Sequence, residues 1–400
     1  MKPQDGMPAG RRAILLALCM AAVLWVSLTG SLSSPLEVPR LMLLAGLFLT
    51  IRVFFMKNIS SPTGSGAIVM ALGIFINGAL IHFPVLNADL GRSLAVILFI
   101  LFLFIAGSYI RDAVQKKAYT AHFADPVGSF AIGTWIAGTS VCGIVVCGRL
   151  PAWIPLVQVL FIGSIGLWFC FICRAGKSFL HFFESEAWRK VHGILFLSTV
   201  STQSLILFWK AAFGAGAGYR LTAPWAILLG LIFYCMSFYL VARRYICEGR
   251  DLDLDRNWFN TNCITHGAMS ITGLASAVSG VVPPVLTLLI WLWAISCFVV
   301  VEIIEIVRAV KRTRIYGMAD GLLVYNPSQW SRNFTFGMLY AFTLNFDITQ
   351  SAAVGRLLLP LHQMVLHSFA WLVLALLIFE IFVFFRDRLS LSVPAVRARS

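Results

Sequence analysis

Residues 128–140 read GSFAIGTWIAGTS, and residues 153–171 read WIPLVQVLFIGSIGLWFCF. Each stretch, with its neighbours, approaches the length of about 20 apolar residues that crosses a bilayer as a helix. The first is rich in Gly, Ser and Thr, which allow close helix packing or line a wet cavity. The second carries bulky aliphatic and aromatic side chains, which suit contact with lipid. We interpret the two as an inner helix followed by an outer helix.

The same alternation extends along the chain from residue 66 to residue 385. Small and hydroxyl-bearing residues recur in every second segment, and bulky apolar residues fill the segments between them. With two further apolar segments near the N-terminus, the sequence predicts an all-α polytopic membrane protein of about twelve helices. Their expected ranges are 13–31, 38–56, 66–83, 91–110, 127–147, 151–173, 190–211, 223–242, 262–281, 283–306, 332–350 and 358–385.

Three regions follow from this pattern. Residues 62–385 are expected to form a ten-helix core of five inner/outer hairpins around a central pore. Residues 1–61 would add an N-terminal hairpin, and residues 386–400 a cytoplasmic basic tail. The alternative for the core is tight packing of the small residues with no lumen.

Composition supports a membrane protein. Of the 400 residues, 59% are hydrophobic and only 12% are charged, and the mean hydropathy is +0.86. A soluble domain carries about 25% charged residues, because its surface must be hydrated. The long apolar runs also exclude a disordered chain, a disulfide scaffold and a transmembrane β-barrel, whose strands alternate apolar and polar residues.

The placement of the basic residues predicts the orientation. The chain has 31 Lys and Arg against 17 Asp and Glu. With both termini in the cytoplasm, the twelve-helix arrangement puts 25 of the 31 basic residues on the cytoplasmic side and 6 outside, as the positive-inside rule requires. No basic run alternates with aromatics on a polar face, so we expect no nucleic-acid partner.

Residues 13–31 also resemble a signal peptide, because Arg11 and Arg12 precede an apolar run that ends in Ser and Gly. Cleavage would leave eleven helices and the same topology. We expect the segment to be retained, since the weakly hydrophobic segment 38–56 would gain from a hairpin partner.

The inner helices carry no acidic or basic side chain in their middle sections. Buried ionisable groups mark proton relays and cation sites, so their absence argues against a pump with a carboxylate relay. Hydroxyls, amides and positive helix N-termini suit a small anion instead. The residues expected to line the path are Phe130, Gly133, Thr134, Ser201, Gln203, Ser204, His266, Ser270 and Thr335.

One motif in each inner helix resembles the tellurite-resistance/dicarboxylate transporter family, whose superfamily includes plant slow anion channels. The motifs occur in the family order and cover about residues 62–385. They are the stretches 69–74 (VMALGI), 125–141 (DPVGSFAIGTWIAGTSV), Trp188 with 198–204 (STVSTQS), 258–275 (from Trp258 to Ala275) and 330–340 (WSRNFTFGMLY).

The resemblance implies a pore of inner helices, probable homotrimers and transport of small anions in a bacterial-type inner membrane. It also implies a pore gate at Phe336, with Phe334 beside it. The proline that follows the gating phenylalanine in the family is replaced here by Gly337. No cofactor, metal site or catalytic residue is expected.

Two other functions remain open. An integral-membrane enzyme acting on lipid or glycan would need convergent His, Asp or Glu residues at the cytoplasmic face. The candidates are His122 with Asp125, and His181 and Glu184 with His192. The other alternative, a membrane scaffold that transports nothing, is disfavoured because little of the sequence lies outside the predicted membrane helices.

Two further sets of ionisable residues bear on the function. His266 could couple protons or sense anions, although a neutral hydrogen-bonded histidine is commoner. Glu302 and Glu305 lie near Arg308 at a helix end and are interpreted as interfacial side chains that reach toward water.

Overall fold

The computed structural model describes residues 61–249 and 253–390, so the predicted segments 13–31 and 38–56 lie outside the described residues. Every regular element in the described part is helical. Eight of its helical segments are long and apolar enough to cross a membrane. This confirms the prediction of an all-α, multi-pass membrane protein.

The helices fall into two length classes. The short class, of 12 to 17 residues, contains α3 (Gly66–Asn77), α5 (Gly133–Arg149), α7 (Leu197–Phe213), α9 (Ile264–Ser279) and α11 (Trp330–Asn345). The long class, of 31 to 38 residues, contains α4 (Pro84–Val114), α6 (Ile154–Glu184), α8 (Ala217–Glu248), α10 (Pro284–Gly321) and α13 (Leu359–Ser390). A six-residue helix, α12 (Ala352–Leu357), precedes α13.

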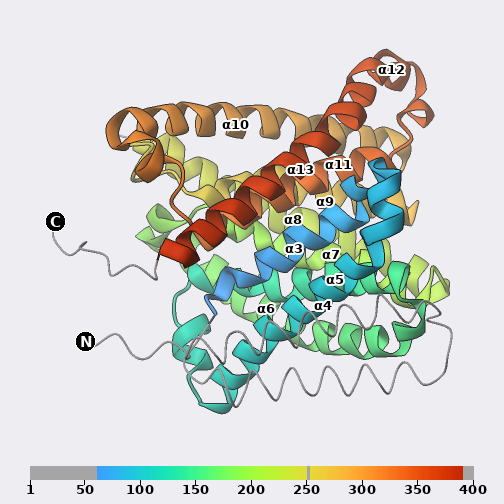
Figure 1. The fold of residues 1–400 in the computed structure, drawn as a ribbon, viewed down its shortest axis with the longest axis horizontal. Coiled ribbons are helices and arrows are strands. Elements are labelled where there is room, and N and C mark those ends of the chain that lie inside the picture. Colours follow the sequence, from blue (N-terminus) through green and yellow to red (C-terminus); the bar gives the residue numbers. More distant parts are fainter. Residues whose placement is uncertain (1–60, 250–252, 391–400) are drawn as a thin grey trace.

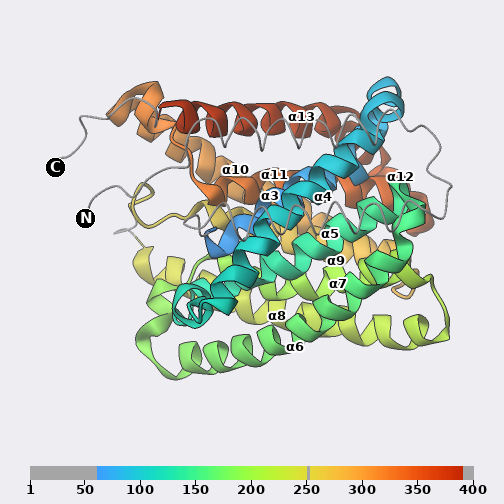
Figure 2. The ribbon, with the colours of Figure 1, turned by 60° about the horizontal axis from the view of Figure 1, so that its bottom comes forward.

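The five short helices pack in a closed cyclic order. α3 packs against α5, α5 against α7, α7 against α9, α9 against α11, and α11 against α3. The long helices pack on the outside of these five: α4 and α6 on α5, α8 on α7 and α9, α10 on α9, and α13 on α11. In Figure 2, α13 runs along one edge of the molecule and α6 along the opposite edge, with short helices between them.

Glycines allow the short helices to approach closely. A side chain at Gly337 of α11 would overlap Ile74 of α3, and one at Gly143 of α5 would overlap the ring of Phe208 on α7. By contrast, a Cβ placed at Gly163 of the long helix α6 would have no neighbouring atom within 4 Å. The small residues of the short helices therefore allow neighbouring helices to pack closely, because no large side chain separates their backbones.

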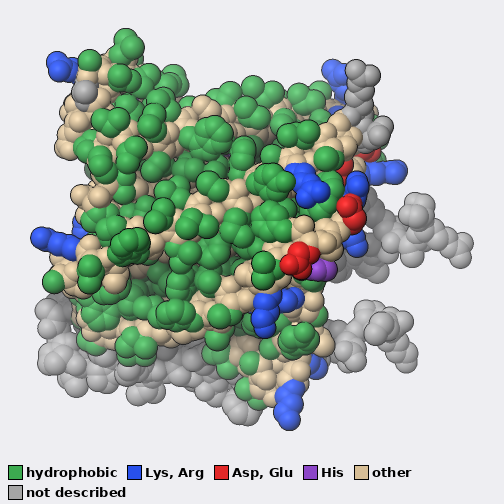
Figure 3. Space-filling view, turned by 180° about the vertical axis from the view of Figure 1, so that it is seen from behind, with side chains coloured by type: hydrophobic (Ala, Val, Ile, Leu, Met, Phe, Trp, Pro, Cys, Tyr) green, Lys and Arg blue, Asp and Glu red, His purple; other side chains and the backbone are tan. Residues whose placement is uncertain are grey.

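The outer surface is suited to lipid. Large exposed apolar side chains occur all along the long helices, including Ile162, Trp225, Leu289, Val300 and Trp371. In the face shown in Figure 3, hydrophobic side chains cover the middle and charged side chains lie toward the two edges. This distribution is the one a bilayer requires, because charge is costly at its centre.

The long helices extend beyond the predicted spans. α10 was expected to end near residue 306 and continues to Gly321, with a break at Gly317, whose φ is 74°. Glycine adopts this left-handed conformation without the steric cost that a side chain would impose. The extension carries the end of α10 past the start of α11, at the left of Figure 1.

Candidate functional site

All five short helices begin at the same end of the ring. A 3₁₀ turn comes just before each of them, and these turns contact one another in the same cyclic order as the helices. We call this end the start face. The turns are η1 (Thr63–Ser65), η4 (Gly128–Ile132), η7 (Gly193–Phe196), η9 (Asn260–Cys263) and η10 (Pro327–Gln329).

This arrangement gives the start face a positive electrostatic character. The first N–H groups of a helix have no partner within it, and the helix dipole places partial positive charge at the same end. Five such ends lie side by side here. The positive ends of five helix dipoles are therefore gathered at the start face.

Polar side chains cap several of these starts. The Asp125 carboxylate accepts hydrogen bonds from the backbone N–H groups of Val127 (3.2 Å) and Gly128 (2.8 Å). The Asn262 carbonyl oxygen accepts one from the N–H of Gly193 at 2.9 Å. These two caps involve residues within motifs that the sequence analysis singled out, and they fix the geometry of the start face.

Two of the three histidines suggested for an enzyme site, His122 and His192, have other partners in the structure. His122 lies 2.9 Å from the Thr63 hydroxyl through Nδ1 and 3.3 Å from the Asp112 carboxylate through Nε2. Asp125 serves instead as the cap described above. His192 lies 2.8 Å from the Thr261 hydroxyl and stacks on Phe259.

Burial and the charge of Arg244 lower the pKa of His192 to about 4. This imidazole is therefore neutral at physiological pH. Its partners lie at the start of the next inner helix, so it joins η7 to η9.

Three of the predicted path-lining residues contact outer helices. Phe130 packs among aromatic rings of α6, the nearest being Phe179 at 5.1 Å. The Gln203 amide donates to the backbone carbonyl of Ile227 on α8 at 3.1 Å. The His266 ring lies 5.2 Å from the ring of Phe298 on α10.

The remaining predicted path-lining residues lie within or between the short helices. Gly133 faces Leu197 across the contact of α5 with α7, and Thr335 lies against Gly267 across the contact of α9 with α11. The hydroxyls share one feature: each donates to a carbonyl three or four residues earlier in its own chain segment. They are Thr134, Ser201, Ser204, Ser270 and Thr335.

The two predicted gate residues lie on different sides of α11. The Phe336 ring packs 4.9 Å from that of Phe298 on α10 and 6.3 Å from that of Phe369 on α13, so it faces the outer helices. Two residues of an α-helix are separated by about 200° around its axis. Phe334 is therefore on the opposite side of α11, and it is 1% exposed.

A buried polar cluster connects α9, α10 and α11. His266 is 0% exposed, and its Nε2 lies 3.8 Å from Glu302 Oε1. The Arg332 guanidinium lies 3.8 Å from Glu302 and 2.6 Å from Glu305. Arg308 pairs with Glu305 at 3.5 Å. We call these five residues the ionic cluster.

A cavity of about 450 Å³ opens beside the ionic cluster, between α10, α11 and α13. Its polar lining includes Arg308, Arg312, Arg332, Asn333 and Glu380. The carboxylates of the cluster and the cavity come from the outer helices α10 and α13. Glu302 and Glu305 are interpreted from the sequence as interfacial side chains, and the signal not used is Glu380, a glutamate within the apolar segment 358–385.

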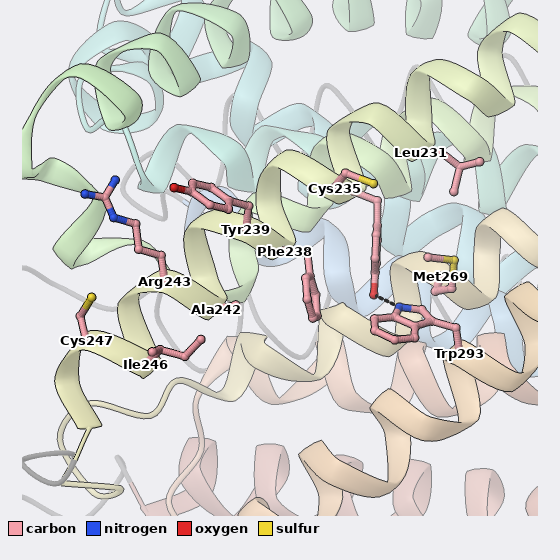
Figure 4. A pocket seen from close by; sticks show the side chains of 11 residues that line it. Leu231, Cys235, Phe238, Tyr239, Ala242, Arg243, Ile246, Cys247, Met269 and Trp293 are labelled. Atoms are coloured by element: carbon pink, nitrogen blue, oxygen red, sulfur yellow. Dashed lines mark hydrogen bonds between the residues drawn. The ribbon is translucent and has the colours of Figure 1, made fainter.

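A second cavity lies on the outer surface between α8, α9 and α10 (Figure 4). It measures about 700 Å³ and is almost entirely apolar. The Trp293 indole donates to the Tyr234 hydroxyl at 2.9 Å along its lining, and Arg243 lies at one end. Its chemistry suits apolar chains, which separates it from the polar cavity beside the ionic cluster.

Comparison with known proteins finds no match to any family model and no match among curated proteins. The class to which the chain belongs therefore rests on its own sequence and structure. These define a multi-pass, all-helical membrane protein.

Proposed function

We propose that this protein transports small anions across the membrane, as a channel or carrier, along a path enclosed by the five short helices. One observation carries the proposal: five short, small-residue helices pack in a closed cyclic order with all their N-termini at one face. Helices in a simple antiparallel bundle would alternate their ends. Because the five helices point in the same direction, the positive ends of their dipoles lie together at the face where an ion would enter.

The chemistry of the ring favours an anion over a cation. Its middle sections carry no fixed charge, so no ring of carboxylates attracts a cation there. Cation paths commonly use rings of Asp or Glu, whereas half-helix N-termini favour anions. Selectivity would then come from the start face and from the width of the path.

We assign the constriction to Phe334 and a supporting role to Phe336. Phe334 lies on the side of α11 away from Phe336, and we assign it to the side that faces the ring axis. Phe336 anchors the same helix between Phe298 and Phe369. An apolar ring at the axis closes a path by steric block or by dewetting.

The proposal includes a homotrimer in a bacterial-type inner membrane, with both termini in the cytoplasm. The asymmetric distribution of Lys and Arg supports this orientation. On this basis the start face opens to the cytoplasm.

The test is flux through the purified full-length chain in liposomes. Chloride, nitrate, sulfite, succinate and malate form the panel, with potassium as the cation control. We expect at least one anion to move faster than in protein-free liposomes while potassium does not. Equal movement of potassium, or no anion movement in an oriented and folded sample, would contradict the proposal.

An enzyme is the second candidate, and one contact favours it. The Thr63 hydroxyl, His122 and Asp112 form a continuous chain of the kind that activates a hydroxyl nucleophile. Incubation of the same liposomes with labelled phospholipid would detect a transferase or hydrolase. Product that disappears in the Thr63→Val variant would support the enzyme.

A further inference from the structure

Seven buried polar atoms without a hydrogen-bond partner gather at the ionic cluster and the cavity beside it. They are His266 Nδ1 and Nε2, Glu302 Oε1, Arg308 Nε, Arg332 Nε, Asn333 Oδ1 and Glu380 Oε1. Buried polar groups in native proteins are almost always paired with protein or water. Their concentration at one polar cavity points to water and an exchangeable ligand at this place.

The charges at this place do not balance. The ionic cluster and Glu380 together contribute two arginines, Arg308 and Arg332, and three carboxylates, Glu302, Glu305 and Glu380. The third arginine of the cavity, Arg312, is bonded to Asp255. With His266 neutral, the set therefore has a formal charge of −1, and an uncompensated buried charge is costly.

We propose that this set of residues binds one exchangeable proton and couples its movement to that of the transported anion. The proposal rests on the proposed transport function. The proton comes from water in the cavity and adds to a lone pair of Glu302 or Glu380, whose Oε1 atoms have no hydrogen-bond partner. The charge of the set changes from −1 to 0, and no other bond forms or breaks.

A free anion is a poorer ligand for the same cavity. Each arginine in its lining already contacts a carboxylate: Arg308 and Arg332 share Glu305, and Arg312 binds Asp255. An incoming anion would have to displace one of these partners and enter a site of net negative charge. A proton removes that charge instead.

The position of the site explains how protonation would reach the transport path. The titratable and charged groups nearest Glu302 are His266 from α9 and Arg332 from α11, each 3.8 Å away. Arg332 also pairs with Glu305, which pairs with Arg308, and the charge of Arg332 acts on Glu380 of α13 and on Cys263 before α9. A proton on Glu302 removes its negative charge and so weakens its attraction to Arg332.

Arg332 lies two residues before Phe334, the proposed constriction, on the same helix. The His266 ring also contacts Phe336, with ring centroids 6.1 Å apart. A change in the pairing of Arg332 therefore acts on the first turns of α11, where we propose that the path closes.

The first experiment compares uptake of the anions of the panel with and without an inward proton gradient, with an internal pH dye to record proton entry. If one proton accompanies each monovalent anion, a tenfold proton gradient drives about tenfold accumulation, equivalent to about 1.4 kcal/mol. We expect Glu302→Gln and Glu380→Gln to bring the ratio of gradient-driven to gradient-free uptake toward one. Glu186→Gln, which alters an exposed glutamate paired with Arg189, should keep the wild-type ratio.

Anion flux that is indifferent to the gradient in the wild-type protein would overturn the coupling but leave the transport function intact. A second measurement does not depend on flux. Infrared difference spectra of the purified protein between roughly pH 5 and 8 should show a carboxyl group that titrates, and the band should be lost in Glu302→Gln or Glu380→Gln. Identical spectra in the wild-type protein and both variants would overturn the proton site itself.

Discussion

Phe334 and Phe336 are two residues apart, and their surroundings assign them different roles. Phe336 contacts rings from two outer helices and from His266. Phe334 is buried on the other side of α11. Truncation of each side chain should therefore affect a different property of the protein.

The Phe334→Ala variant should raise anion flux at least severalfold, because it widens the proposed constriction. The Phe336→Ala variant should instead lower stability by about 3–5 kcal/mol, the usual effect of removing a buried phenylalanine. Liposome flux, normalised to folded protein, and thermal unfolding in detergent measure the two effects. A larger flux increase in Phe336→Ala than in Phe334→Ala would contradict this assignment.

The sequence could not predict which face of its helix each candidate residue occupies. Gln203 and His266 are predicted to line the path because they occur on small-residue helices, and the family resemblance implies that Phe336 is the gate. Successive residues turn by about 100° around a helix, so membership of a helix does not fix the face on which a residue lies. In the structure these three contact α8 and α10.

At the scale of single elements, Gly337 shows why α11 and α3 lie so close. A side chain at this position would meet Ile74. Gly163 of α6 is an internal control, because nothing lies within 4 Å of a Cβ placed there. Both are helical glycines, so their intrinsic helix propensities are comparable.

The Gly337→Val variant should therefore lower the unfolding temperature and the yield of monodisperse protein. The Gly163→Val variant should stay near wild type in both. Size-exclusion chromatography and thermal unfolding in the same detergent provide the comparison. Equal behaviour of the two variants would show that the contact of α11 with α3 is looser than described.

The loop before α9 is attached to the end of α10 through Asp255. The Tyr316 hydroxyl donates to its carboxylate at 2.7 Å and Arg312 pairs with it, which together hold the pKa of Asp255 below its usual value. A carboxylate with a depressed pKa stabilises the folded state above its unfolded pKa of about 3.9. That contribution is lost as the pH falls through the lower, folded-state value.

The Asp255→Asn variant should consequently increase hydrogen exchange of residues 253–259 at neutral pH. Strong acid should produce the same increase in the wild-type protein. Mass spectrometry of the exchanged peptides measures both. Unchanged exchange in Asp255→Asn would mean that other contacts, such as that of Asp253 with Lys311, hold the loop.

The sequence allowed us to predict which of the described helices are inner or outer and in what order they occur. It did not allow us to predict that the five short helices pack as a closed ring. Composition distinguishes the small-residue segments from the bulky ones, because inner helices contact other helices or water whereas outer helices contact lipid. The contact of α11 with α3 joins segments more than 250 residues apart, and no local pattern specifies it. The ionic cluster depends on the same long-range packing, since it joins residues of α9, α10 and α11.

At the scale of the whole molecule, the proposed transport requires water inside the ring and lipid outside the long helices. The exposed apolar surface of the long helices supports the second condition. The first is the central claim, because dry packing of the five short helices would leave no route for an ion. Thiol chemistry distinguishes these two interiors, since charged reagents reach only cysteines that contact water.

The most direct measurement is modification of Phe334→Cys by a small, charged, membrane-impermeant thiol reagent in liposomes, in a background where the native cysteines are replaced. We expect Phe334→Cys to react, with a fall in anion flux and slower reaction when the transported anion is present. Phe336→Cys, which faces the outer helices, should not react. A Phe334→Cys protein that carries anions normally and never reacts, or that reacts only with lipid-soluble reagents, would contradict a water-filled path inside the ring.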